Sequence, residues 1–236
     1  MAQKLAAHQP CFLPSIAFFR KLLSVDIFVI ADDYQFTTNA AINRTLIKAP
    51  RGAAWLTVPV LTKGLGRQRI NQISINNGIA WQARHKRTLE VNYCYAPYFE
   101  QFCDDLFLFF EHEWCRLVDL NLALITFLAR MLNIPTTIVR SSGLPLLGKS
   151  NCRLYEMLQQ TDCATYVADM DLQSHLSVAE FERNGFNLEF VDYYQATETY
   201  HQQFASFVAG LSIVDLLFNE GIAGVEQLKT GYSGCA

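Results

Sequence analysis

The sequence lacks internal repeats, low-complexity tracts and long linkers rich in Pro, Gly or Ser, so nothing in it divides the chain into separate units. Charged residues are also scarce: they make up 17% of the 236 residues, whereas 51% are hydrophobic. A chain of this length and composition can bury the core of one domain, and we expect residues 1–236 to form a single domain. Apolar surface left over would be available for association into a homo-oligomer.

Other absences disfavour several classes of protein. The net charge of −3 leaves no broad basic field for nucleic acid. The seven cysteines show no CxxC spacing, so we predict no metal site and a reducing, cytoplasmic location. The N-terminus does not read as a secretory signal. The most apolar run, Trp114 to Leu132, contains Arg116, Asp119 and Arg130, which favours a buried helix over a membrane span.

Segments with the patterns of strands and helices alternate at both ends of the chain. The expected strands are Lys4–His8, Ile27–Ala31, Ala54–Val60, Ile70–Ile75, Thr136–Val139, Thr165–Val167 and Leu188–Phe190. The expected helices are Ser15–Ser24, Trp81–Tyr93, Tyr98–Glu111, Glu113–Leu132, Asn151–Gln160, Val178–Asn184 and Ser212–Asn219. This order predicts an α/β fold with a mainly parallel sheet and flanking helices. We also expect one β-hairpin insertion, formed by the third and fourth strands, and a central helical region at about 80–133.

Ionisable side chains stand where each of the first two strands ends. His8 closes the first strand, and Asp32 and Asp33 follow the second. Ligands of open α/β sheets bind outside the carboxyl ends of the strands. His8 is suited to act as a general acid or base, or to donate to a phosphate or an oxyanion, and Pro10 nearby fixes the backbone. The alternative is a surface histidine at a strand end.

The two aspartates are not expected to act as a pair, because adjacent strand residues point to opposite faces. One of Asp32 and Asp33 would line the crevice as a metal-bound carboxylate, as a partner of a ribose hydroxyl, or as a base that deprotonates an amine. The structural alternative is a turn carboxylate that bonds its own backbone.

Two further candidates lie in the next part of the chain. Arg44, which follows Asn43, is suited to clamp a phosphate or carboxylate, and the alternative is a solvated loop cation. His85 shares a helix face with Trp81 and Leu89, which is more typical of a core histidine than of a ligand.

Residues Gly143 to Ser150 match the pattern GxxxxGK[ST] of phosphate-binding loops. Such a loop works through successive backbone N–H groups, and Pro145 removes one of them, so we expect no nucleotide-hydrolase loop here. Ser141, Ser142 and Lys149 would still surround a helix N-terminus, which can hold an anion.

Ser212 and Asp215 resemble a capping box at the start of the last helix, and Gly221 would end that helix. Asp215 and Asn219 also share one helix face, so they form a candidate polar pair that looks into a site.

Taken together, these stretches resemble the WbqC-like protein family. The matching pieces are His8-Gln9-Pro10, Leu13-Pro14, Phe18-Phe19-Arg20-Lys21, Asp26 to Ile30, Asp32 to Phe36, Asn43-Arg44, Trp55 to Val60, His85, Glu90, Asn92-Tyr93, Ala96 to Phe99, Arg140-Ser141-Ser142, Gly148-Lys149, Arg153-Leu154 and Leu211 to Asn219.

The resemblance implies a cytoplasmic bacterial protein of surface-polysaccharide (O-antigen) biosynthesis. It implies a transferase that moves glycine, or a similar activated acyl group, onto an amino sugar. The chain departs from the family pattern at Ser15, at Ala17 and in the loop Ala168–Asp171, which follows a strand.

We therefore predict a small-molecule substrate, such as a nucleotide-linked sugar with an activated acyl donor, and identify no cofactor. His8, Asp32 and Asp33 are the predicted catalytic residues, because acyl transfer needs a base and a stabilised oxyanion. The predicted substrate contacts are Gln9, Gln35, Asn43, Arg44, His85, Ser141, Ser142, Lys149, Asp215 and Asn219.

Two other functions stay open. A histidine turn between a strand and a helix is similar to nucleotidyltransferases of the HxGH type, although the second histidine and its glycine are missing here. A non-catalytic carbohydrate-binding module is the other alternative, given aromatics such as Phe12, Phe36, Trp81 and Tyr98.

Overall fold

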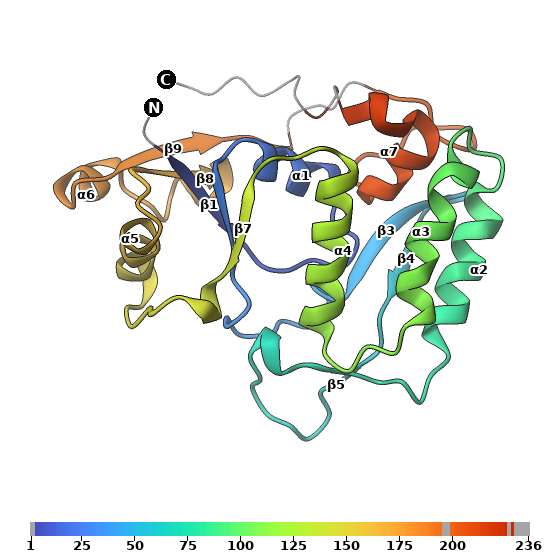
Figure 1. Ribbon diagram of the computed structural model, residues 1–236, viewed down its shortest axis with the longest axis horizontal. Helices are drawn as coiled ribbons and strands as arrows, with labels where there is room; N and C mark the ends of the chain where they lie inside the picture. The colour runs from blue at the N-terminus through green and yellow to red at the C-terminus, as the bar shows by residue number, and fades with distance from the viewer. Residues whose placement is uncertain (1–2, 195–198, 226–227, 229–236) are drawn as a thin grey trace.

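The protein is built around a five-stranded parallel sheet (Figure 1). The computed structural model describes residues 3–194, 199–225 and 228. The sheet strands are β1 (Lys4–His8), β2 (Ile27–Ile30), β7 (Thr137–Arg140), β8 (Thr165–Asp169) and β9 (Asn187–Val191), and their order in space is β7-β2-β1-β8-β9. The predicted α/β class with a mainly parallel sheet is confirmed.

Helices cover both faces of the sheet because the strands are apolar on both sides. Ala6 and Phe28 face a core shared with α1 (Ile16–Leu23) and α4 (Leu117–Met131). Their chain neighbours Leu5 and Val29 point to the opposite face of the sheet. There they join a second core with α5 (Ser150–Gln160) and α6 (Val178–Arg183). The last helix, α7 (Ile213–Glu220), packs on α1 and on the inserted elements.

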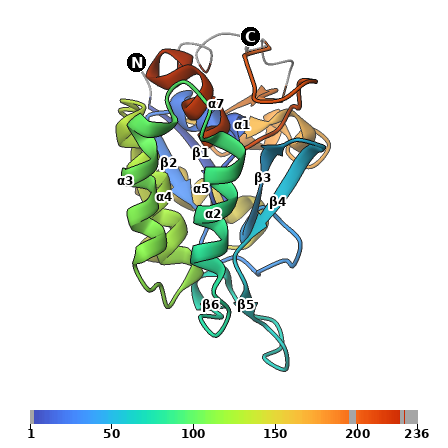
Figure 2. The ribbon, with the colours of Figure 1, turned by 90° about the vertical axis from the view of Figure 1, so that its right-hand side faces the viewer.

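The long segment between β2 and β7 carries the insertions (Figure 2). Its elements are β3 (Arg44–Ala49), β4 (Gly52–Thr57), β5 (Val60–Leu61), η1 (Ile70–Gln72), β6 (Ser74–Ile75), α2 (Trp81–Tyr93), α3 (Phe99–Glu111) and α4. The remaining short helices are η2 (Ser141–Gly143), η3 (Met170–Leu172) and η4 (Gly221–Val225). The hairpin insertion and the central helical region are both present.

The strands of the hairpin differ from the prediction. β4 pairs with β3 rather than with the segment after Gly66, and only the short β5 and β6 pair across that turn. The segment Arg44–Ala49 was not among the expected strands, and it forms β3 by pairing with β4. The Lys48 side chain in this strand is buried, with its amine donating to the Ser206 carbonyl.

The sheet has a topological switch point at β1. From β1 the chain proceeds to β2 on one side, and β8 pairs with β1 on the other side. Open α/β sheets bind ligands in the crevice outside such a point. The β1–α1 loop, residues 9–15, starts there. Among the described residues no helix is long and apolar enough to cross a bilayer.

Candidate functional site

The β1–α1 loop is held in place by side chains from distant parts of the chain. Asn121 Nδ2 donates to the Pro10 carbonyl at 3.0 Å. The hydroxyls of Thr45 and Ser212 both donate to the Leu13 carbonyl at 2.8 Å. Leu13 itself adopts a positive φ of 41°, which a leucine tolerates only when its surroundings fix it. The loop therefore presents His8 from a rigid support.

Within the part of the chain that the structure describes, the hydrogen bonds of the His8 ring are made by Nδ1. Its Nδ1 lies 2.8 Å from the Gln9 carbonyl. Because a carbonyl oxygen only accepts, Nδ1 carries the proton and a neutral ring has its lone pair on Nε2. Burial, followed by the charge of Lys21, lowers the pKa of His8. The ring is therefore neutral at physiological pH, with Nε2 free to accept a proton.

A buried ion pair lies behind this histidine. Lys21 Nζ donates to Asp169 Oδ2 at 2.6 Å and to the Ala7 carbonyl at 3.1 Å, and the Lys21 side chain is only 2% exposed. Lys21 comes from α1 and Asp169 from the end of β8, so the pair spans the switch point. We did not predict either as a site residue. The position of Asp169 at the end of a strand was the signal that could have found it.

Cys11 is close to His8 but is no nucleophile. Its Sγ lies 3.8 Å from His8 Nδ1 and 3.5 Å from the Gln9 carbonyl. Burial raises the pKa of the Cys11 thiol to about 12. Since the thiolate is the reactive form, a Cys–His dyad is disfavoured.

His8 and Arg44 line the same cavity, of about 170 Å³, which we call the His8 pocket. The Arg44 guanidinium lies 4.1 Å above the ring of Trp55, which is 52% exposed. Both residues come from the β3–β4 hairpin. The structure thus brings together a neutral imidazole, a cation and an exposed aromatic ring. His8 and Arg44 were candidate site residues in the sequence, whereas Trp55 was not.

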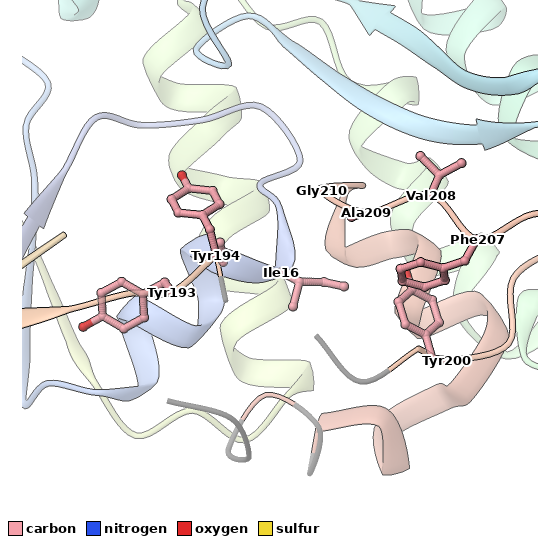
Figure 3. A pocket seen from close by; sticks show the side chains of 9 residues that line it. Ile16, Tyr193, Tyr194, Tyr200, Phe207, Val208, Ala209 and Gly210 are labelled. Atoms are coloured by element: carbon pink, nitrogen blue, oxygen red, sulfur yellow. The ribbon is translucent and has the colours of Figure 1, made fainter. Parts of the chain in front are cut away.

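A second cavity of about 240 Å³ adjoins the His8 pocket, and Tyr194 and Gly210 line both. Figure 3 shows its aromatic character, with Ile16 of α1 between Tyr194 and the side chains of Tyr200 and Phe207. The last two rings meet edge to face, with centroids 5.4 Å apart. This cavity extends the His8 pocket with apolar surface.

Asp32 lies at the end of the neighbouring strand but has no free acceptor position. Its carboxylate is fully buried and accepts from Arg140 Nε (2.8 Å), Ser141 Oγ (3.1 Å), Ser142 N (3.0 Å) and Ser142 Oγ (2.7 Å). Burial alone would raise its pKa, but the bonds from Ser142 and Arg140 outweigh that effect and leave the pKa lowered. Ser141 and Ser142 thus contact Asp32, and the group joins β2 to the chain after β7.

Asp33 and Lys149 line a different cavity, of about 540 Å³, which we call the Lys149 pocket. Asp33 accepts from Ser141 Oγ at 2.5 Å and from Arg153. Both aspartates therefore approach the same hydroxyl. The prediction that strand alternation separates them was wrong, because β2 ends at Ile30 and both stand in the following turn.

Two amides of the GxxxxGK[ST] loop are already bonded within the protein. The N–H groups of Leu147 and Gly148 donate to the Glu156 carboxylate at 2.8 and 2.9 Å. The Glu156 carboxylate thus occupies the position in which an anion was expected. The group of this loop that can still contact an anion is the exposed Lys149 side chain.

The remaining predicted contacts are not in one crevice with His8. His85 is buried among Phe12, Trp81 and Phe110, and burial lowers its pKa to about 4. Asn43 is buried and donates to the Val58 carbonyl at 2.9 Å. Gln35 is exposed, and Gln9 contributes its carbonyl to His8.

Asp215 and Asn219 are buried in the core. Asp215 accepts from the hydroxyls of Tyr93 (2.7 Å) and Tyr200 (2.6 Å), and Asn219 accepts from Gln203. Ser212 is the N-cap of α7, as expected, whereas Asp215 takes no part in a capping box. Tyr200 links this network to the cavity beside the His8 pocket.

Comparison with known proteins places the whole arrangement in a family. The chain is 32% identical over 228 residues to the uncharacterized protein Rv1507c of Mycobacterium tuberculosis, and the match covers 96% of this chain and 98% of that protein. No solved structure matches the chain. The model of the WbqC-like protein family matches residues 9–227, which include the β1–α1 loop and every residue that lines the three pockets except His8, one position before the match. The chain belongs to the WbqC-like protein family.

Proposed function

We propose that the protein transfers an activated acyl or aminoacyl group, such as glycine, onto the amine of an amino sugar in surface-polysaccharide biosynthesis. The observation that carries the proposal is the state of His8: Nδ1 is tied to the Gln9 carbonyl, which leaves Nε2 as a proton acceptor in a pocket. A base of this kind is what an amine nucleophile requires.

The proposed chemistry uses His8, Arg44 and the Lys21–Asp169 ion pair. His8 Nε2 takes a proton from the attacking amine while the nitrogen forms its bond to the carbonyl carbon of the donor. The Arg44 guanidinium compensates the negative charge that develops on the carbonyl oxygen. The bond to the leaving group then breaks, and the electron pair leaves with that group. The Lys21–Asp169 pair stands behind His8, and the charge of Lys21 helps to keep the imidazole neutral.

The Trp55 ring under Arg44 is suited to hold a sugar, because aromatic faces pack on the apolar face of such ligands. The adjoining cavity lined by Tyr200 and Phe207 would receive the acyl portion of the donor. In this arrangement Asp32 positions the chain after β7 and is not the base.

The test is turnover of the purified protein with activated acyl donors and amino sugars linked to a nucleotide. The His8→Asn variant keeps a donor for the Gln9 carbonyl but lacks Nε2, so we expect it to lose turnover by at least about a hundredfold. His175→Asn, which alters an exposed histidine, is the matched control. Full activity of His8→Asn would show that His8 is not the base.

A nucleotidyltransferase-like activity is the second candidate, because His8 stands at the switch point of a parallel sheet. Release of pyrophosphate from a nucleoside triphosphate, lost in His8→Asn, would favour it over acyl transfer. A binding module without catalysis is favoured only if nucleotide sugars bind and no donor gives turnover.

A further inference from the structure

The Lys149 pocket lies apart from His8, and acyl transfer does not explain it. It opens between the turn after β2, which supplies Asp33 and Tyr34, and the loop before α5, which supplies Leu146 to Ser150. Arg153 comes from α5, and Arg69 comes from the segment before η1. Its volume of about 540 Å³ is within the usual range for small-molecule sites, roughly 300–1,000 Å³.

The charge of this pocket is positive although the whole chain is negative. Its charged lining residues are Arg69, Lys149 and Arg153 against Asp33 alone. Arg153 is committed to Asp33. Arg69 and Lys149 are exposed, and within the described part of the chain neither side chain forms an ion pair. Two cations therefore face the cavity without a counter-charge.

The backbone fixes where one of these cations stands. Phe36 N donates to the Gln68 carbonyl, and Ile70 N donates to the Tyr34 carbonyl, both at 2.9 Å. This ladder brings Arg69 to the turn after β2. Glu156 is not among the residues that line the cavity, and its carboxylate accepts from the Leu147 and Gly148 amides.

The other walls of the pocket suit a nucleoside. Tyr34 is partly exposed and carries the Arg153 guanidinium 5.4 Å from its ring centroid, and Leu146 and Leu147 add apolar surface. In doubly wound sheets an acidic residue near the end of the second strand bonds a ribose hydroxyl. Asp33 stands in that place, three residues after β2 ends at Ile30.

We propose that the Lys149 pocket binds a nucleoside diphosphate: Arg69 and Lys149 hold the phosphates, Asp33 holds the ribose, and Tyr34 with the leucines holds the base. The proposal concerns binding only and goes beyond acyl transfer, so it stands if His8 carries out other chemistry. The Lys149 pocket would then also bind the nucleotide part of a sugar donor or acceptor.

The experiment is calorimetric titration of the full chain with UDP, ADP, GDP and CDP, with pyrophosphate and the free nucleosides as separate arms. We expect saturable binding of at least one diphosphate. The double variant Arg69→Ala/Lys149→Ala should weaken it at least about tenfold, since the loss of one charged contact alone is worth about that factor. Lys63→Ala/Arg67→Ala is the matched control, because these exposed cations lie on the same loop but outside the pocket.

Three results would overturn the proposal. They are the absence of saturable diphosphate binding to the folded wild-type chain, equal weakening in the control double variant, and binding of pyrophosphate as tight as that of every diphosphate.

Tyr34→Phe should retain affinity for the diphosphate and Tyr34→Ala should lose it. His8→Asn should bind the diphosphate as the wild type does, so a failure of the proposed acyl transfer leaves this result distinguishable. Thermal melts check that each variant is folded.

Discussion

The ends of β1 and β2 lie side by side, with His8 paired in register with Ile30, yet the polar groups there are used in opposite ways. Asp32 is fully buried and accepts hydrogen bonds from an arginine and two serines. His8 donates from Nδ1 to the Gln9 carbonyl and lines the His8 pocket. Its Nε2 is the nitrogen that we propose as the proton acceptor. A polar residue at the carboxyl end of a strand is thus not a site by its position alone.

The difference lies in how many partners each group already has. A carboxylate whose acceptors are filled by its own protein stabilises the fold and cannot take a proton from a substrate without losing those bonds. A histidine that is rigidly held by one nitrogen remains available through the other. Substitution at the two strand ends should therefore affect stability at one and turnover at the other.

The largest effect on stability is expected for Asp32→Ala. It leaves the Arg140 guanidinium and both donors of Ser142 without their acceptor, although Ser141 keeps its bond to Asp33, and it should reduce the free energy of unfolding by roughly 3–5 kcal/mol. Asp119→Ala is the matched control, because Asp119 lies 4.0 Å from the same Arg140 but is 52% exposed. Its cost should be within about 0.5 kcal/mol. Denaturant unfolding measures both, and a small cost for Asp32→Ala would contradict the structural role.

A second test asks whether a lowered pKa is enough to mark a functional histidine. His85 has a pKa of about 4 against the ordinary 6.5, yet it lines none of the pockets described above. Since its pKa is lower in the folded state, the unfolded chain binds more protons below pH 6.5, and stability is lost as pH falls from there towards 4. The loss should approach about 3 kcal/mol.

Unfolding of wild type and His85→Phe at several pH values between 7 and 4.5 measures this loss. We expect the variant to show a shallower decline, since it has nothing to protonate at this position. His175→Phe, at an exposed position, should follow the wild type. The same slope in wild type and His85→Phe would mean that His85 does not titrate as its burial requires.

Much of the fold followed from the sequence because it depends on local patterns. The segments Lys4–His8 and Ile27–Ala31 were predicted as strands and form β1 and β2, the second ending one residue earlier, and α2 occupies the predicted range Trp81–Tyr93. The strand β3 was missed because Lys48 looks solvated in sequence, and only the tertiary structure buries its charge.

The site was less predictable because it depends on long-range contacts. His8 and Arg44 were identified as candidates, but their common pocket requires the β3–β4 hairpin to fold over the β1–α1 loop. Lys21 was part of the family resemblance without a role, and its bond to Asp169 joins residues 148 positions apart. Asp215 and Asn219 share a helix face as expected, but that face is buried, and Asp215 accepts from the hydroxyls of Tyr93 and Tyr200.

A much smaller effect on stability than that of Asp32→Ala is expected for His8→Asn, at the other end of the comparison. The half-buried ring donates through Nδ1 to the Gln9 carbonyl, and an asparagine amide can replace that donor. We expect a cost under about 1 kcal/mol in denaturant unfolding, several-fold less than for Asp32→Ala. His8→Leu removes both the ring and the donor to the Gln9 carbonyl. The difference in unfolding free energy between His8→Leu and His8→Asn therefore measures what the hydrogen bond contributes. If His8→Asn costs as much as Asp32→Ala, His8 is a structural residue, and the contrast between the two strand ends disappears.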